Sequence, residues 1–228
     1  YTGHRCAYDI VINGLKRLEY RGYDSAGVIV EGQNNDVELK KTKGKVADLV
    51  SISKDLEGSA HVGMGHTRWA THGVPSDRNS HPHLSNNGKI AIIHNGIIEN
   101  YDTIKTMLIE KGFTFASDTD TEVLVNLIQY IMDTQEVDFP TAVRYALNEV
   151  YGAYAITVMH KDHPGFLVVG RLGSPLAIGI GENEYFVASD ASPFVEFTKE
   201  AIYLEDGHMA TISLEKGVEI RAIVDNSV

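Results

Sequence analysis

Apolar residues recur at the three- and four-residue spacing of an amphipathic helix in four stretches of the chain. The clearest stripe is formed by Phe139, Ala142, Val143, Ala146, Leu147 and Val150. Similar stripes lie within residues 8–18, 101–108 and 124–131. The last of these follows the run Asp118-Thr119-Asp120-Thr121-Glu122, whose hydroxyls and carboxylates suit a helix N-terminus. We therefore predict a helix at each of these four places.

Short runs rich in β-branched and aromatic residues lie between and after these helices. The predicted strands are 26–30, 61–69, 89–94, 153–159, 166–169, 185–188, 201–204 and 209–214. Helices flank the strands in blocks, and the last third of the chain is nearly all strand. This order favours the α+β class, with antiparallel sheets and packed helices, over a regular βαβ series. The six prolines are spread along the chain rather than gathered in a linker, so we expect one domain over residues 1–228.

Composition narrows the classes of partner. The chain has 20 basic and 31 acidic residues, a net charge of −11, which argues against nucleic acid or an anionic membrane as a partner. No apolar run approaches the ~18 residues of a membrane span, and the first residues lack the apolar region of a signal peptide. The single cysteine cannot form an internal disulfide. We expect a soluble, cytoplasmic protein, and the sequence leaves open whether it is a homo-oligomer.

The dipeptide Asn95-Gly96 follows the predicted strand 89–94 and has two interpretations. The amide of Asn95 and the backbone N–H of Gly96 can converge on one developing oxyanion. Asn-Gly is also the commonest dipeptide of tight turns, and a turn is expected before the helix near Tyr101.

Arg68 and Asp120 form a second candidate pair. A guanidinium can bind an α-carboxylate through two hydrogen bonds, and a carboxylate can bind an α-ammonium group. Together they would recognise the zwitterionic head of a free amino acid. The alternative is an ordinary salt bridge or two surface charges. Trp69, next to Arg68, is the only tryptophan and is better suited to a core or a pocket wall than to catalysis.

Three other features could indicate a metal site, a nucleotide site or a nucleophile, but the sequence supports none of these functions further. His66, His72, His81, His83 and His94 lie close in sequence, but their spacing matches no zinc motif and no carboxylate accompanies them, so we expect no metal site. The segment Gly179-Ile180-Gly181 lacks the third glycine and the helix of a dinucleotide fingerprint, so it indicates the end of a strand and no nucleotide cofactor. Cys6 precedes a predicted helix, and a helix N-terminus can lower the pKa of a thiol and make it a nucleophile. A free cysteine is also a common small core residue, and we favour that interpretation.

Several segments taken together resemble one known family. They are Tyr20-Arg21-Gly22-Tyr23-Asp24-Ser25-Ala26-Gly27, residues 66–73, residues 94–100, Thr119-Asp120-Thr121-Glu122, Gly152-Ala153-Tyr154-Ala155, residues 171–176 and Ala188-Ser189-Asp190. The family is the glutaminase domain, class II glutamine amidotransferase, of the glutamine–fructose-6-phosphate aminotransferases (glucosamine-6-phosphate synthases). The resemblance extends over the whole chain and implies the fold of N-terminal-nucleophile hydrolases, a four-layer αββα sandwich with two antiparallel sheets.

The resemblance also implies a mechanism. Members of this family begin with Cys-Gly-Ile-Val-Gly, and the first cysteine attacks the side-chain amide of L-glutamine with its own α-amino group as the base. A thioester and ammonia form, and water then releases glutamate. An α-amino group, with a pKa of ~7.7–8.0, is suited to moving protons near neutral pH.

Residue roles carry over from this family where the motifs match. The implied oxyanion hole consists of Asn95 and the Gly96 N–H. Arg68 would bind the α-carboxylate of glutamine, and Asp120 its α-ammonium group. Trp69, Thr71 and His72 would line the pocket. Arg21 and the backbone of Gly22 would orient the terminal amine and thiol.

The beginning of the chain differs from the family pattern. Tyr1-Thr2-Gly3 resembles the continuation just after the cysteine-led opening, so we expect the nucleophile to precede Tyr1 and do not assign that role to Cys6. Residues 1–228 are then expected to be one glutaminase domain less its first few residues. The expected partner is a C-terminal sugar isomerase domain outside this chain, where fructose 6-phosphate becomes glucosamine 6-phosphate. The alternative is a module that binds glutamine without hydrolysing it.

Overall fold

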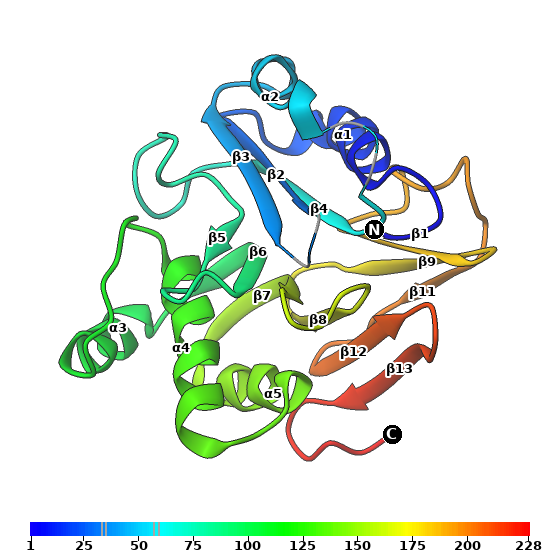
Figure 1. Ribbon diagram of the computed structural model, residues 1–228. Helices are drawn as coiled ribbons and strands as arrows, with labels where there is room; N and C mark the ends of the chain where they lie inside the picture. Colours follow the sequence, from blue (N-terminus) through cyan, green and yellow to red (C-terminus); the bar gives the residue numbers. More distant parts are fainter. Residues whose placement is uncertain (33, 35, 57, 59) are drawn as a thin grey trace.

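A computed structural model describes residues 1–32, 34, 36–56, 58 and 60–228 of the chain (Figure 1). Its helices are α1 (Ala7–Leu18), α2 (Val46–Ile52), α3 (Tyr101–Glu110), α4 (Asp120–Gln135) and α5 (Phe139–Glu149), with short 3₁₀ turns η1 (Glu19–Arg21) and η3 (Lys54–Leu56). The four helices predicted from apolar stripes are all present. Helix α2 was not predicted, because its seven residues are too few to repeat a helical pattern.

The strands form three antiparallel sheets. One has the order β1 (Thr2–Gly3), β10 (Glu184–Ala188), β9 (Ala177–Gly181) and β11 (Ala201–Tyr203). A second has the order β3 (Val37–Lys43), β2 (Ser25–Glu31) and β4 (Gly63–Arg68). The six-stranded sheet has the order β13 (Gly217–Ala222), β12 (His208–Ser213), β8 (Leu167–Leu172), β7 (Gly152–His160), β6 (Ile90–Ile98) and β5 (His83–Leu84). Residues 179–181 end strand β9, as predicted.

The two smaller sheets are joined at the start of the chain. The N–H of Gly63 donates to the carbonyl of Tyr1 at 3.0 Å, and the Tyr1 amine donates to the carbonyl of Gly63 at 2.8 Å. Thr2 bridges Val62 in antiparallel fashion while pairing with Tyr185 of β10 on its other side. The segment around β1 therefore connects β10 with β4, and the two small sheets form one layer.

Three hydrophobic clusters hold four layers together. One cluster packs α3, α4 and α5 against the six-stranded sheet, with the buried Phe139, Leu124 and Ile156 among its members. A second packs α1 and α2 against the smaller sheets. The third lies between the two sheet layers and includes Ile29 of β2 and Met159 of β7. Figure 1 shows α1 and α2 on one side of the strands and α4 and α5 on the other.

The order of layers is therefore helix, sheet, sheet, helix, as the resemblance implied, and the α+β class is confirmed. The difference from expectation is that the first sheet layer consists of two sheets joined at Tyr1 and Thr2. Within the described ranges, no helix has the length and apolar character needed to cross a membrane.

Candidate active site

A cavity of about 280 Å³ lies where the end of β4, the middle of β6 and the beginning of α4 meet. This volume is close to the lower end of the ~300–1,000 Å³ range of small-molecule sites. Seven residues predicted as functional from the sequence line it: Arg21, Arg68, Trp69, Thr71, Asn95, Gly96 and Asp120. The fold thus brings together side chains from segments that are far apart in the sequence.

Arg68 is the last residue of β4 and is only 4% exposed. Its Nη2 donates to the backbone carbonyls of His72 and, at 3.0 Å, of Gly73. Its Nη1 is buried and has no hydrogen-bond partner in the described part of the chain. Burial lowers the pKa of Arg68, against the opposing influence of the Asp24 and Asp120 carboxylates. A buried guanidinium with an unpaired N–H group is suited to binding an anion.

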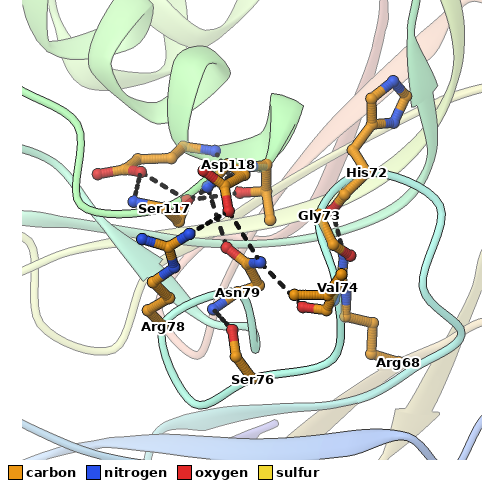
Figure 2. A network of polar contacts seen from close by, with 11 residues as sticks. Arg68, His72, Gly73, Val74, Ser76, Arg78, Asn79, Ser117 and Asp118 are labelled. Carbon is orange, nitrogen blue, oxygen red and sulfur yellow. Dashed lines mark hydrogen bonds and ion pairs between the residues drawn. The ribbon is translucent and has the colours of Figure 1, made fainter.

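The loop that supplies these two carbonyls is held from the other side by Asn79, which is fully buried (Figure 2). The Nδ2 of Asn79 donates to the carbonyl of Val74 at 2.9 Å and to Asp118 Oδ2 at 3.3 Å. Its Oδ1 accepts from the backbone N–H of Asp118 at 2.9 Å. Asn79 therefore ties the loop beside Arg68 to the segment that begins α4.

Asp120 is the first residue of α4 and is 3% exposed. Its Oδ2 accepts a hydrogen bond from the N–H of Ile98 at 2.8 Å, which joins the start of α4 to the end of β6. The helix begins here because Thr119 caps it: its Oγ1 accepts from the N–H of Glu122 at 3.3 Å. Arg68 and Asp120 face the same cavity and make no salt bridge with each other among the described residues. The salt-bridge alternative for this pair is therefore wrong in this structure.

Asn95 and Gly96 lie inside strand β6, opposite Ala155 and Tyr154 of β7. The alternative interpretation, a tight turn at this dipeptide, is therefore wrong. Gly96 has a φ of +127°, and a Cβ there would lie 2.1 Å from the carbonyl oxygen of Ala153. Only glycine fits this backbone. The Oδ1 of Asn95 lies 2.8 Å from Nε2 of His66 on β4.

The histidines that are close in sequence are also close in space. The His66 and His81 rings stack at 4.3 Å, and His81 contacts His83 edge to face at 4.8 Å. Burial lowers the pKa of His66 to about 4 and also lowers those of His81, His83 and His94. Within the described ranges, no three His, Cys, Asp or Glu side chains are grouped so that they could hold a metal ion.

Three predicted residues lie differently from the rest. His72 is not part of the cavity lining: its carbonyl binds Arg68, and its ring packs edge to face on Tyr101 at 4.9 Å. Gly22 also lies outside the lining, against the backbone of Arg68, where a Cβ would be 2.8 Å from the Arg68 carbonyl carbon.

Arg21 lines the cavity but pairs with Asp190 at 3.4 Å. Cys6 lies outside the lining, at the N-cap of α1, and packs against the second hydrophobic cluster. Its exclusion as the nucleophile stays a prediction.

Sequence reasoning missed other residues of the site. The lining also includes Ala155, Thr157 and residues 186–189, whose apolar and small side chains do not indicate a particular chemistry. Asn79 was missed because its partner, Asp118, is 39 residues away. His66 was noted only as a possible metal ligand, and its contact with Asn95 spans two sheet layers.

Known proteins are similar to this chain over most of its length. Residues 53–219 match the glutamine amidotransferase domain family. The glutamine–fructose-6-phosphate aminotransferase (isomerizing) of Bacteroides thetaiotaomicron is 54% identical over 98% of this chain and 36% of its own length. Those of Chlorobaculum tepidum and Thermococcus kodakarensis are 51% and 46% identical over 93% and 96% of this chain. The chain spans about a third of the length of these relatives.

Two solved structures are similar over 99% of the chain. The glutamine phosphoribosylpyrophosphate amidotransferase of B. subtilis, complexed with ADP and GMP, superposes with a TM-score of 0.81 at 27% identity and is covered over 49% of its length. A structure described as the allosteric regulatory enzyme of purine biosynthesis superposes with a TM-score of 0.83 at 28% identity and is covered over 48%. The fold, the residues gathered at the cavity and the match over most of the chain lead to one conclusion: the chain belongs to the glutamine amidotransferase domain family.

Proposed function

We propose that this cavity hydrolyses the side-chain amide of L-glutamine to glutamate and ammonia. Arg68 binds the α-carboxylate, and Asp120 binds the α-ammonium group. The side chain of glutamine then extends toward Asn95 and Gly96, whose N–H groups stabilise the oxyanion of the tetrahedral intermediate. Trp69 and Thr71 form part of the wall, and Arg21 orients the attacking group from the rim.

The observation that carries this proposal is the placement of two opposite charges in one cavity without pairing. Arg68 keeps a buried Nη1 without a hydrogen-bond partner among the described residues, while Asp120 is held apart from it by its bond to Ile98. Leaving buried charges unpaired is costly. A ligand with its own carboxylate and ammonium groups would satisfy both, and a free α-amino acid is such a ligand.

The proposed nucleophile is a cysteine on a segment preceding Tyr1. Tyr1 lines the cavity and pairs with Gly63, the first residue of β4. If the chain before Tyr1 continues this antiparallel pairing, each earlier residue lies opposite the next residue of β4, and the fifth residue before Tyr1 lies opposite Arg68. The Cys-Gly-Ile-Val-Gly opening of the resembled family has this length, so its cysteine would lie opposite Arg68, beside the bound amino acid.

In the whole protein, we propose that the ammonia is used to convert fructose 6-phosphate to glucosamine 6-phosphate. The support is that relatives 46–54% identical to this chain and about three times as long are glutamine–fructose-6-phosphate aminotransferases. Residues 1–228 would then be a single glutaminase domain, and its partner would be the sugar isomerase domain that makes up the rest of the protein.

The test is an assay of glutamate release by the whole protein, with L-glutamine and its α-methyl ester as matched substrates. The ester keeps the ammonium group and the amide but lacks the α-carboxylate. We expect turnover of L-glutamine, and a KM for the ester that is about 10–100-fold higher, since one charge-assisted hydrogen-bond pair is lost. Binding of glutamine by calorimetry without glutamate release would support the binding module instead. Equal KM values would contradict the role of Arg68.

A further inference from the structure

His66 and Asn95 come from different sheet layers and meet at the cavity. His66 lies on β4 and Asn95 on β6, and both line the cavity. Their contact joins His66 Nε2 to Asn95 Oδ1 at 2.8 Å. In the proposed catalysis, the other end of the same amide, Nδ2, is the donor. The orientation of the Asn95 side chain therefore decides whether the cavity meets a donor or an acceptor.

The protonation of the His66 ring decides that orientation. A carbonyl oxygen only accepts hydrogen bonds, so Nε2 must carry a proton to bind Asn95 Oδ1. Burial lowers the pKa of His66 to about 4, outweighing the opposing influence of Asn95 and of the His94 carbonyl, so the ring is neutral at pH 7 and carries one proton. With that proton on Nε2, Nδ1 holds only a lone pair. Nδ1 is buried without a hydrogen-bond partner among the described residues.

The plane of the ring is also fixed. His66 stacks on His81 with an interplanar angle of 15°. The side chains of Val11 and Leu15 pack over the neighbouring Gly65, where a Cβ would lie 2.4 Å from Val11 Cγ1. The strand is thereby pressed closely against α1, and a rotation of the His66 ring would have to break the stack with His81.

We propose that His66 is a positioning residue that turns the Asn95 amide so that its NH₂ group faces the substrate. This inference rests on the proposed function. In the opposite tautomer, the bare Nε2 would attract the NH₂ group of Asn95 and turn its carbonyl oxygen into the cavity. That oxygen would repel a developing oxyanion instead of stabilising it. His66 thus selects the catalytically useful orientation without touching the substrate.

Two substitutions in the whole protein separate this role from a purely structural one. His66→Phe keeps a flat ring against His81 but removes the donor, whereas His66→Gln keeps an N–H that can reach Asn95. We expect His66→Phe to lower kcat for glutamine hydrolysis about 10-fold or more, up to the 10²–10³-fold of a fully lost oxyanion donor, with KM changed less than about 2-fold. His66→Gln should recover part of kcat. Equal kcat in wild type and His66→Phe would overturn the proposal.

A double-mutant cycle gives a second, sharper test. In an Asn95→Ala background there is no amide to orient, so His66→Phe should lower kcat no further. A decrease equal to that in the wild-type background would mean that His66 acts by another route.

Nitrogen-15 NMR of the histidine rings provides a readout that needs no activity. The expected result is a His66 ring protonated at Nε2 at pH 7, and protonation at Nδ1 would overturn the proposal. A wild-type protein that releases no glutamate would contradict the proposed function itself. If the wild type is active and His66→Phe has the same kcat, only the proposed role of His66 is contradicted.

Discussion

Asn79 binds Asp118 with both ends of its side-chain amide, accepting from the Asp118 N–H at 2.9 Å and donating to Asp118 Oδ2 at 3.3 Å. Figure 2 shows this pair between the loop that reaches Arg68 and the segment leading into α4. The pair therefore ties the loop that binds Arg68 to the segment that leads into Asp120.

Asn79→Ala should raise the KM for glutamine about 10-fold, because the loop carbonyls that orient Arg68 lose their anchor. The variant should also lose about 1–3 kcal/mol of unfolding free energy, since the buried Asn79 gives up its hydrogen bonds to the carbonyl of Val74 and to the N–H and carboxylate of Asp118. Steady-state kinetics and urea unfolding measure both. The matched control is Arg78→Ala, which removes an exposed ion pair to the same Asp118 and should change stability by less than about 1 kcal/mol. A KM unchanged in Asn79→Ala would argue against this coupling.

Gly96→Ala should abolish most of the activity. A Cβ at this position would lie 2.1 Å from the Ala153 oxygen at a φ of +127°, so β6 must shift and the proposed oxyanion donor moves with it. We expect kcat to fall about 100-fold or more. Gly88→Ala is the matched control, because Gly88 also has a positive φ, +70°, but has no atom within 4 Å of the added Cβ. Normal kcat in Gly96→Ala would show that this backbone is not part of the site.

Arg68→Lys should raise the KM for glutamine about 10–100-fold and lower kcat much less. Lysine keeps the charge but cannot bind the loop carbonyls and a carboxylate together. The comparison variant is Arg17→Lys, in an exposed pair with Glu196, which should leave KM as in the wild type. If Arg68→Lys bound glutamine normally, the α-carboxylate would have to lie elsewhere.

The stability of the protein should fall on mild acidification. Burial lowers the pKa of His160, remote from the site beside Phe139, to about 4, whereas an unfolded histidine titrates near ~6.5. Between these values the unfolded chain binds more protons than the folded one, so the free energy of unfolding decreases as the pH falls. Replacing His160 by Phe should reduce the loss between pH 7 and pH 5 by about 2 kcal/mol in urea unfolding. The same loss in both proteins would show that His160 does not contribute.

Sequence patterns predicted the elements that have strong local signals. The stripe from Phe139 was confirmed as helix α5, because all of its apolar residues face one cluster. Strand β3 was not predicted. It is an edge strand with the sequence Val-Glu-Leu-Lys-Lys-Thr-Lys, and its lysines interrupt the alternation of apolar and polar residues that indicates a strand. Asn95-Gly96 suggested a turn, and only pairing with β7, some 60 residues later, keeps it in a strand.

The candidate site was predictable only where residue chemistry is distinctive. Arg68, Asp120 and Asn95 were proposed from their functional groups and lie at one cavity. His66 could not be assigned its contact with Asn95, because that contact depends on how two sheet layers stack. The same holds for Asn79, whose partners are set by the path of a loop rather than by a periodic pattern.

The most direct test of the whole account is the kcat for glutamate release from L-glutamine by the whole protein and by its Asn95→Ala variant. If this cavity hydrolyses glutamine with Asn95 as an oxyanion donor, the wild type releases glutamate, and the variant has a kcat about 10²–10³-fold lower with little change in KM. A variant with the kcat of the wild type would contradict the account.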